Sequence, residues 1–128
     1  MANTLENILD GYNRTIEDAE FEHCFLTDKA DDTICLDVRG AANAAPYVDL
    51  FGDRWLNIPQ ETLKDHFAEI PPDKRLLVVC NSGVRSYEAL RQLETAGLTN
   101  AVNLQGGIAA LKKSGALDLK DSEEPAKD

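Results

Sequence analysis

Residues 76–86 of this 128-residue chain read Leu-Leu-Val-Val-Cys-Asn-Ser-Gly-Val-Arg-Ser. The four apolar residues at the start of this stretch are typical of a β-strand that is buried on both faces. After a short polar loop, apolar residues recur at helical spacing, which predicts a helix from Ser86 onward. Cys80 is therefore expected at the carboxyl end of a strand, facing the amino terminus of a helix.

This position of Cys80 has a chemical consequence. A helix amino terminus carries partial positive charge, and loop amides can turn toward an anion held there. A thiol at this point is expected to ionise more readily than a free cysteine. Arg85 adds a permanent cation, whose planar guanidinium suits an oxyanion such as sulfate, thiosulfate or phosphate. The loop that joins the nucleophile to this anion-binding group comprises Asn81, Ser82, Gly83, Val84, Arg85 and Ser86.

The alternative is that Cys80 is a small buried apolar residue and Arg85 a surface charge of the helix. The presence of Gly83 and Arg85 within the same short loop favours the reactive interpretation.

The loop from Cys80 to Ser86 resembles the active-site loop of single-domain rhodaneses, which are sulfurtransferases. Three further segments resemble the same family, in the same order along the chain. They are the Asp-Val-Arg strand end at 37–39, the Asn-Ile-Pro segment at 57–59, and the Leu-x-Gly-Gly turn within 103–108. Together the four segments extend the resemblance over about residues 33–112 and imply a rhodanese-like fold.

The resemblance implies a sulfurtransferase mechanism centred on Cys80. In this mechanism the thiolate attacks the outer sulfur of thiosulfate or of a persulfide donor, and a persulfide forms on the cysteine. A thiol or cyanide acceptor then removes the sulfur. The amides of residues 81–86 would stabilise the negative sulfur, as an oxyanion hole stabilises developing charge, and Arg85 would help to orient the donor. The implied enzyme is a transferase of sulfur-containing groups that uses no cofactor.

Three alternatives stand beside this function. Rhodanese-like domains also serve as sulfur-relay or protein-interaction modules with little small-molecule turnover. Cysteine phosphatases and arsenate reductases have a similar loop, but phosphatases place the arginine six positions after the cysteine, whereas Arg85 is five positions after Cys80. The tighter loop favours a terminal sulfur over a tetrahedral phosphate. The intact Cys80 argues against the third alternative, a catalytically idle domain.

The segment from Leu50 to Trp55 departs from the family pattern. It aligns with a stretch that usually reads Gly-His-Ile-Pro-Gly-Ala, so that Phe51 replaces the expected histidine and Arg54 and Trp55 replace small residues. We expect this segment to pack differently and to reshape one wall near the site, which favours the relay alternative. Trp55 is expected to be a core or rim residue rather than a substrate contact.

Asp37 and Arg39 follow a predicted strand, at the sheet edge where open α/β sheets bind ligands. They are predicted to support the site, either by touching the substrate or by capping loop amides and forming an ion pair. Cys35 is expected to be an inert core thiol, whereas Cys24 lies in a polar stretch and is expected to be partly exposed.

No metal site is predicted. His23 and His66 have no partner at zinc-like spacing, and the three cysteines are scattered at positions 24, 35 and 80. His66 is expected to be a structural histidine in a helix, at the surface or half-buried.

Strands and helices alternate along the chain. The predicted strands are 33–38, 55–57, 75–80 and 101–104, and the predicted helices are 41–50, 60–69, 86–96 and 107–114. Such alternation predicts an α/β fold, an open parallel sheet of about four to five strands with helices on both faces. The domain is expected to span residues 31–116. An extension at 1–30, with a possible amphipathic helix around Leu5 to Tyr12, packs on the domain or leads into it, and an acidic disordered tail follows at 117–128.

The chain has 13 Lys and Arg against 23 Asp and Glu residues, a net charge of −10. This charge argues against nucleic acid and anionic membrane as partners. No secretory signal is evident, and no apolar run approaches the roughly 20 residues of a membrane span. The expected location is the cytoplasm, where thiols stay reduced. The expected partners are small sulfur donors, thiol acceptors and a redox or sulfur-relay protein.

Overall fold

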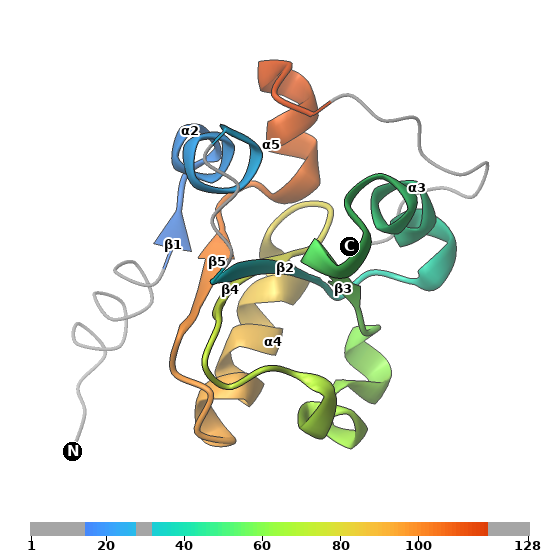
Figure 1. Cartoon of the computed structure of the whole chain (residues 1–128), viewed down its shortest axis with the longest axis vertical. Coiled ribbons are helices and arrows are strands. Elements are labelled where there is room, and N and C mark those ends of the chain that lie inside the picture. The colour runs from blue at the N-terminus through green and yellow to red at the C-terminus, as the bar shows by residue number, and fades with distance from the viewer. Residues whose placement is uncertain (1–14, 28–31, 118–128) are drawn as a thin grey trace.

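Five parallel strands form one sheet in the order β1-β5-β4-β2-β3. The computed structural model describes residues 15–27 and 32–117. The strands are β1 (Thr15–Ile16), β2 (Thr33–Asp37), β3 (Trp55–Asn57), β4 (Arg75–Val79) and β5 (Ala101–Leu104). Helices cover both faces of this sheet (Figure 1), which confirms the predicted fold class.

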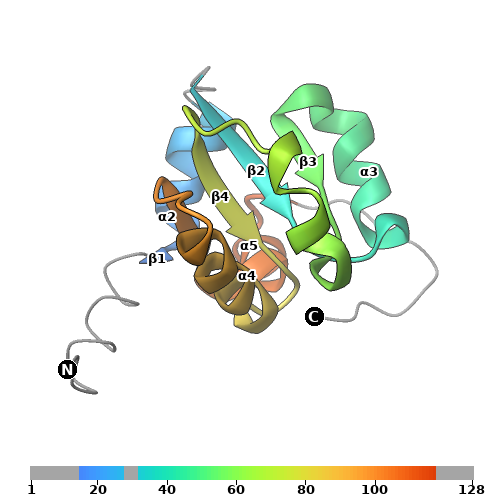
Figure 2. The same ribbon diagram turned by 90° about the horizontal axis from the view of Figure 1, so that it is seen from below.

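The helices divide between the two faces. The α-helices are α2 (Asp18–Phe21), α3 (Ala41–Phe51), α4 (Val84–Thr95) and α5 (Gly107–Ser114), and a π-helical segment, η1 (Glu22–Thr27), follows α2. The described residues also form three 3₁₀ segments: η2 (Gly52–Arg54), η3 (Gln60–Asp65) and η4 (Phe67–Glu69). α2, α3 and α5 lie on one face, whereas α4 lies on the other beside η3 and η4 (Figures 1 and 2).

β4 is central because its sequence is apolar on both sides. Leu76, Leu77, Val78 and Val79 are all buried, as the unbroken apolar run predicts. Alternate residues of β2 and β4 enter two separate cores. Leu36 and Val78 pack beneath α4, whereas Cys35 and Leu77 pack against the opposite layer. The sheet therefore separates two chemically distinct sides of the domain.

The helix predicted at 60–69 is instead the pair η3 and η4, which is interrupted at His66. Its turns close through bonds of the i→i+3 kind, from the N–H of His66 to the carbonyl of Leu63 and from the N–H of Ile70 to the carbonyl of Phe67. Prolines at 59, 71 and 72 bound the segment on both sides. Between these prolines, the two 3₁₀ segments η3 and η4 bring Leu63 and Ile70 into the core.

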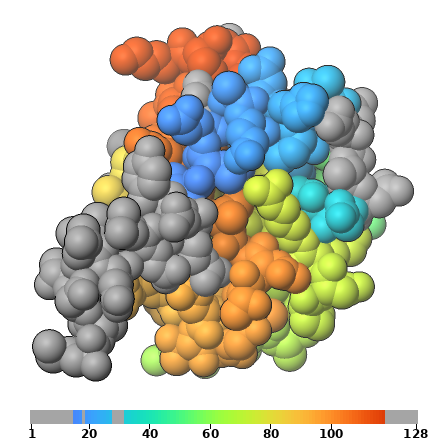
Figure 3. Space-filling view, turned by 90° about the vertical axis from the view of Figure 1, so that its left-hand side faces the viewer, coloured from blue at the N-terminus to red at the C-terminus, as the bar shows by residue number. Residues whose placement is uncertain are grey.

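The described part of the predicted extension, residues 15–27, belongs to the sheet and the core. β1 pairs with β5, and Phe21 and Phe25 are fully buried. Figure 3 shows this segment spread over one side of the molecule. Leu117, the first residue of the predicted tail, is buried in the same core. The predicted helix around residues 5–12 and the rest of the tail lie outside the described residues.

The unusual segment around Phe51 and Trp55 packs against residues 15–27. Trp55 stacks on Tyr47 and on Phe51, with ring centroids 4.9 and 5.2 Å apart, and its edge meets Phe25 at 5.9 Å. The Arg54 guanidinium lies 4.1 Å from the centre of the Phe25 ring. The segment lies with the core opposite α4, not in the core that contains Cys80. The expectation that it reshapes a wall near Cys80 was therefore wrong.

Truncating Phe25 tests whether residues 15–27 stabilise the domain. Phe25→Ala is expected to lower the free energy of unfolding by about 3–5 kcal/mol, because it opens a cavity among the aromatic rings. Leu50→Ala, at a side chain that is 57% exposed, should change it by less than about 0.5 kcal/mol. Urea unfolding measures both values, and equal effects would mean that this segment adds nothing to the fold.

Candidate active site

Cys80 directly follows β4, at the carboxyl edge of the sheet. Its side chain is 0% exposed and packs in the core beneath α4. The chain then turns through Asn81, Ser82 and Gly83 before α4 begins at Val84, two residues earlier than predicted. Gly83 makes this early start possible, because its φ of 95° belongs to the left-handed region that glycine adopts without strain.

Two groups of the loop approach the Cys80 sulfur. The Gly83 N–H donates to Sγ at 2.9 Å, and Sγ in turn donates to Ser86 Oγ at 3.3 Å. Ser86 lies in the first turn of α4, and its hydroxyl donates to Asn103 Oδ1 on β5. The structure thus brings Cys80, Gly83 and Ser86 together, and it adds Asn103, which the sequence analysis quoted only as part of a motif.

The amino terminus of α5 holds the other side of this loop. The N–H groups of Ile108 and Ala109 donate to the carbonyls of Cys80 and Asn81, each at 2.9 Å. This approach requires glycine at 107, because a Cβ there would lie 2.4 Å from the Cys80 carbonyl oxygen. The sequence could have predicted this contact. Gly106-Gly107 follows a strand that ends at the same sheet edge as Cys80, and a glycine pair there allows two main chains to approach closely.

Arg85 lies at the rim of the site. Its guanidinium pairs with Glu61 of η3 at 3.1 Å, and the two side chains are 43% and 68% exposed. The predicted anion-binding group thus points toward a carboxylate on the neighbouring segment. Of the other loop residues, Asn81 and Ser82 are half-buried, and Val84 is 64% exposed.

Asp37 and Arg39 form a buried ion pair on the opposite side of the sheet. The Arg39 guanidinium donates to both carboxylate oxygens of Asp37, and Trp55 Nε1 donates to the same carboxylate at 3.0 Å. Asn57 Nδ2 donates to the main-chain carbonyls of Asp37 and Arg39. Trp55 belongs to the core opposite Cys80, so this pair braces the strand ends without touching the sulfur.

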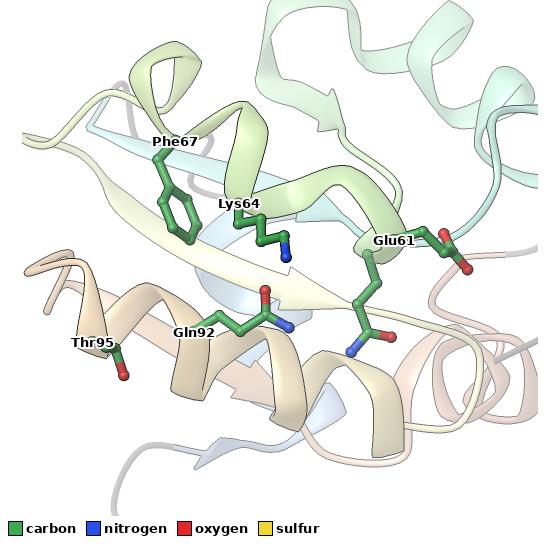
Figure 4. Close-up of a pocket in the computed structure, with 6 residues that line it drawn as sticks. Glu61, Lys64, Phe67, Gln92 and Thr95 are labelled. Atoms are coloured by element: carbon green, nitrogen blue, oxygen red, sulfur yellow. The ribbon is translucent and has the colours of Figure 1, made fainter.

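A groove of about 450 Å³ runs along α4 on the same side as Cys80 (Figure 4). It separates α4 from η3 and η4, and one of its lining residues is the Glu61 that pairs with Arg85. Its lining residues are Gln60, Glu61, Lys64, Phe67, Gln92 and Thr95. The rim of the site therefore continues into a surface with amide, ammonium and aromatic groups.

The other two thiols are poorly suited to act as nucleophiles. Burial raises the pKa of Cys35 well above its ordinary value, and the Asp37 carboxylate raises it further. Burial also raises the pKa of Cys24, an effect that Arg75 partly offsets. All three cysteines are free. His66 pairs with Glu69 at the surface, and no cluster of metal-binding side chains occurs within residues 15–27 and 32–117.

Residues 5–114 match the model of the family described as the rhodanese-like domain. Because this match covers well over half of the sequence, the chain belongs to the rhodanese-like domain family. No helix in the described part of the chain is long and apolar enough to cross a membrane.

Three known proteins are similar to this chain. A protein named "Sulfurtransferase" from Allochromatium vinosum is 33% identical over 85 residues, which are 66% of this chain and 77% of that protein. The structure of a rhodanese-related protein from Thermoplasma volcanium aligns with a TM-score of 0.62 and 30% identity, over 80% of this chain and 93% of that one. An NAD-dependent persulfide reductase from A. fulgidus aligns with a TM-score of 0.60 and 29% identity, over 84% of this chain but only 18% of that protein.

Alanine at two glycines tests the contact between α5 and the loop. Gly97 and Gly107 both have positive φ, but a Cβ at Gly97 would meet nothing within 4 Å. Gly97→Ala is therefore expected to lower the free energy of unfolding by about 1–2 kcal/mol, from backbone strain alone. Gly107→Ala should lower it by a further 1–3 kcal/mol or so, because backbone atoms must shift. Equal losses in urea unfolding would contradict the close approach.

Removing one partner from each ion pair tests their different environments. Asp37→Ala is expected to lower the free energy of unfolding by about 3–5 kcal/mol, because it leaves the Arg39 charge buried. Glu61→Ala should lower it by less than about 1 kcal/mol, since the pair with Arg85 is exposed. Thermal or urea unfolding compares the two variants, and a small effect of Asp37→Ala would contradict the buried pair.

Proposed function

We propose that this chain is a sulfurtransferase that carries sulfur as a persulfide on Cys80. The observation that supports it most is the Gly83 N–H directed at the Cys80 sulfur, within a family that includes a relative named as a sulfurtransferase. The loop residues Asn81 to Ser86 would form the binding site for the sulfur and its donor. The function needs no metal or cofactor.

The reaction has two displacement steps. The Cys80 thiolate attacks the outer sulfur of thiosulfate, so that a new S–S bond forms while the donor's S–S bond breaks and sulfite leaves with the bonding electrons. Cyanide or a thiolate acceptor then attacks the terminal sulfur, and Cys80 leaves as thiolate. Negative charge develops on sulfur in both steps, and the Gly83 amide together with the amino terminus of α4 would stabilise that charge.

Access to the sulfur requires a small movement of the loop side chains, because Cys80 is 0% exposed. Arg85 would receive an anionic donor at the rim once that donor displaces Glu61 from the guanidinium. The groove along α4 would hold the non-reacting part of a larger donor or acceptor. The three free thiols agree with a reducing compartment such as the cytoplasm, where a persulfide carrier can cycle.

A sulfur relay between proteins is the second candidate. The exposed apolar side chain of Val84 stands at the start of α4, next to Arg85, where a partner protein would approach the loop. The similarity to part of a persulfide reductase also supports a module that exchanges sulfur with a redox protein. In that case Cys80 would take its sulfur from a protein partner and turn over thiosulfate poorly.

Thiocyanate production from thiosulfate and cyanide tests the first candidate. Wild type is expected to turn over, and Cys80→Ser is expected to lose at least about a thousandfold in kcat/KM, because the attacking group is gone. Cys24→Ser is the matched control and should retain full activity. Equal activity of wild type and Cys80→Ser would overturn the proposal, whereas no turnover by a wild type that still accepts sulfur from a protein persulfide would favour the relay.

Glu61→Gln tests the competition at the rim. It frees Arg85 for an anionic donor, so the KM for thiosulfate is expected to fall about two- to fivefold with little change in kcat, as the modest strength of an exposed pair allows. Asp73→Asn, at an exposed side chain just before β4 begins, removes the same charge at the sheet edge opposite Cys80 and should leave KM nearly unchanged. Equal effects of the two variants in steady-state kinetics would show that overall charge, and not the pair, controls donor binding.

A further inference from the structure

A buried chain of hydrogen bonds links the Cys80 sulfur to β5. Sγ donates to Ser86 Oγ, Ser86 Oγ donates to Asn103 Oδ1, and Asn103 Nδ2 donates to the Gly83 carbonyl at 3.2 Å. Ser86 is 0% and Asn103 5% exposed. This series of hydrogen bonds closes on itself, because Gly83 accepts from Asn103 through its carbonyl and donates to the Cys80 sulfur through its N–H.

The Gly83 carbonyl fixes the direction of every bond in this chain. A carbonyl oxygen can only accept, so the Asn103 amide must direct its NH₂ group toward Gly83 and its oxygen toward Ser86. The Ser86 hydroxyl has one hydrogen, which it gives to that oxygen. Toward Cys80, Ser86 can therefore only accept, and the group that suits it there is a protonated thiol.

We propose that Asn103 is a positioning residue that holds the Ser86 hydroxyl as an acceptor and thereby opposes the ionisation of Cys80, which the Gly83 N–H and the amino terminus of α4 favour. When the thiol gives its proton to a base in the solvent, the sulfur itself becomes an acceptor, and the Ser86 hydroxyl turns from Asn103 to donate to it. The charge on the sulfur is thus coupled to the hydrogen bond between Ser86 of α4 and Asn103 of β5. This proposal rests on the proposed function only in taking Cys80 as the reacting group.

Two charged pairs stand on the elements packed around this chain of bonds. Arg85 of α4 pairs with Glu61 of η3, and Asp37 pairs with Arg39 beyond the end of β2. Further along α4, Glu88 and Arg91 are exposed. Substitution of Ser86 or Asn103 alters none of these charges, so a change in the ionisation of Cys80 reports on the hydrogen bonds themselves.

The test is a double-mutant cycle read from thiolate ultraviolet absorbance. Asn103→Leu, Ser86→Ala and the double variant are titrated with pH, each referenced to the same protein carrying Cys80→Ser so that the other two thiols cancel. Asn103→Leu is expected to lower the midpoint pH of Cys80 ionisation by about half to one unit, because the freed Ser86 hydroxyl donates to the thiolate without competition. In the Ser86→Ala background the same substitution should leave the midpoint unchanged.

A merely structural role of Asn103 predicts a different result, since loss of its bond to the Gly83 carbonyl disturbs the loop in both backgrounds. Equal shifts with and without Ser86, an upward shift, or no shift would each overturn the proposal. Asn103→Ala is the second variant should Asn103→Leu not fold, and circular dichroism checks each protein. The titration uses no sulfur donor, so failure of the proposed sulfur transfer, read from thiocyanate production, is distinguishable from failure of this proposal.

Discussion

Two hydrogen bonds from the amino terminus of α5 to the carbonyls of Cys80 and Asn81 determine how the loop is arranged. With these carbonyls bound on one side, the loop presents the N–H of Gly83 toward the sulfur on the other. The bonds form only because Gly107 has no Cβ, which allows the start of α5 to approach main-chain atoms of the loop. The geometry of the site thus depends on a turn far along the chain from the cysteine.

The two faces of the sheet carry different groups of polar residues. The face toward α4 holds Cys80, Ser86 and the rim formed by Arg85 and Glu61. The other face holds the buried Asp37–Arg39 pair and the aromatic rings around Trp55. The attraction within a buried ion pair is largely offset by the hydration that both charges lose. Here the carboxylate also accepts from Trp55 Nε1, which ties the ends of β2 and β3 together. Asp37 and Arg39, which the sequence analysis placed near the site, therefore hold the ends of β2 and β3 together.

Local patterns predicted most of the fold. The apolar run before Cys80, the strands at 55–57 and 101–104 and the helix at 107–114 agree with the structure, because burial and turn residues specify them locally. β1 was missed, since a two-residue strand has no periodicity. The start of α4 was misplaced by two residues, because a glycine cap at 83 gives none of the polar signals that usually mark a helix start. The ion pair between Arg85 and Glu61 and the hydrogen bonds of Asn103 to Ser86 and Gly83 depend on segments that meet only in the folded chain.

The central claim is that sulfur passes through Cys80, and intact-protein mass spectrometry after incubation with thiosulfate tests it most directly. The account predicts a gain of one sulfur, about 32 Da, on wild type and on Cys24→Ser, with loss of that mass after cyanide is added and no gain on Cys80→Ser. A sulfur adduct of equal size on Cys80→Ser would contradict the account, because the sulfur would then be carried by another residue.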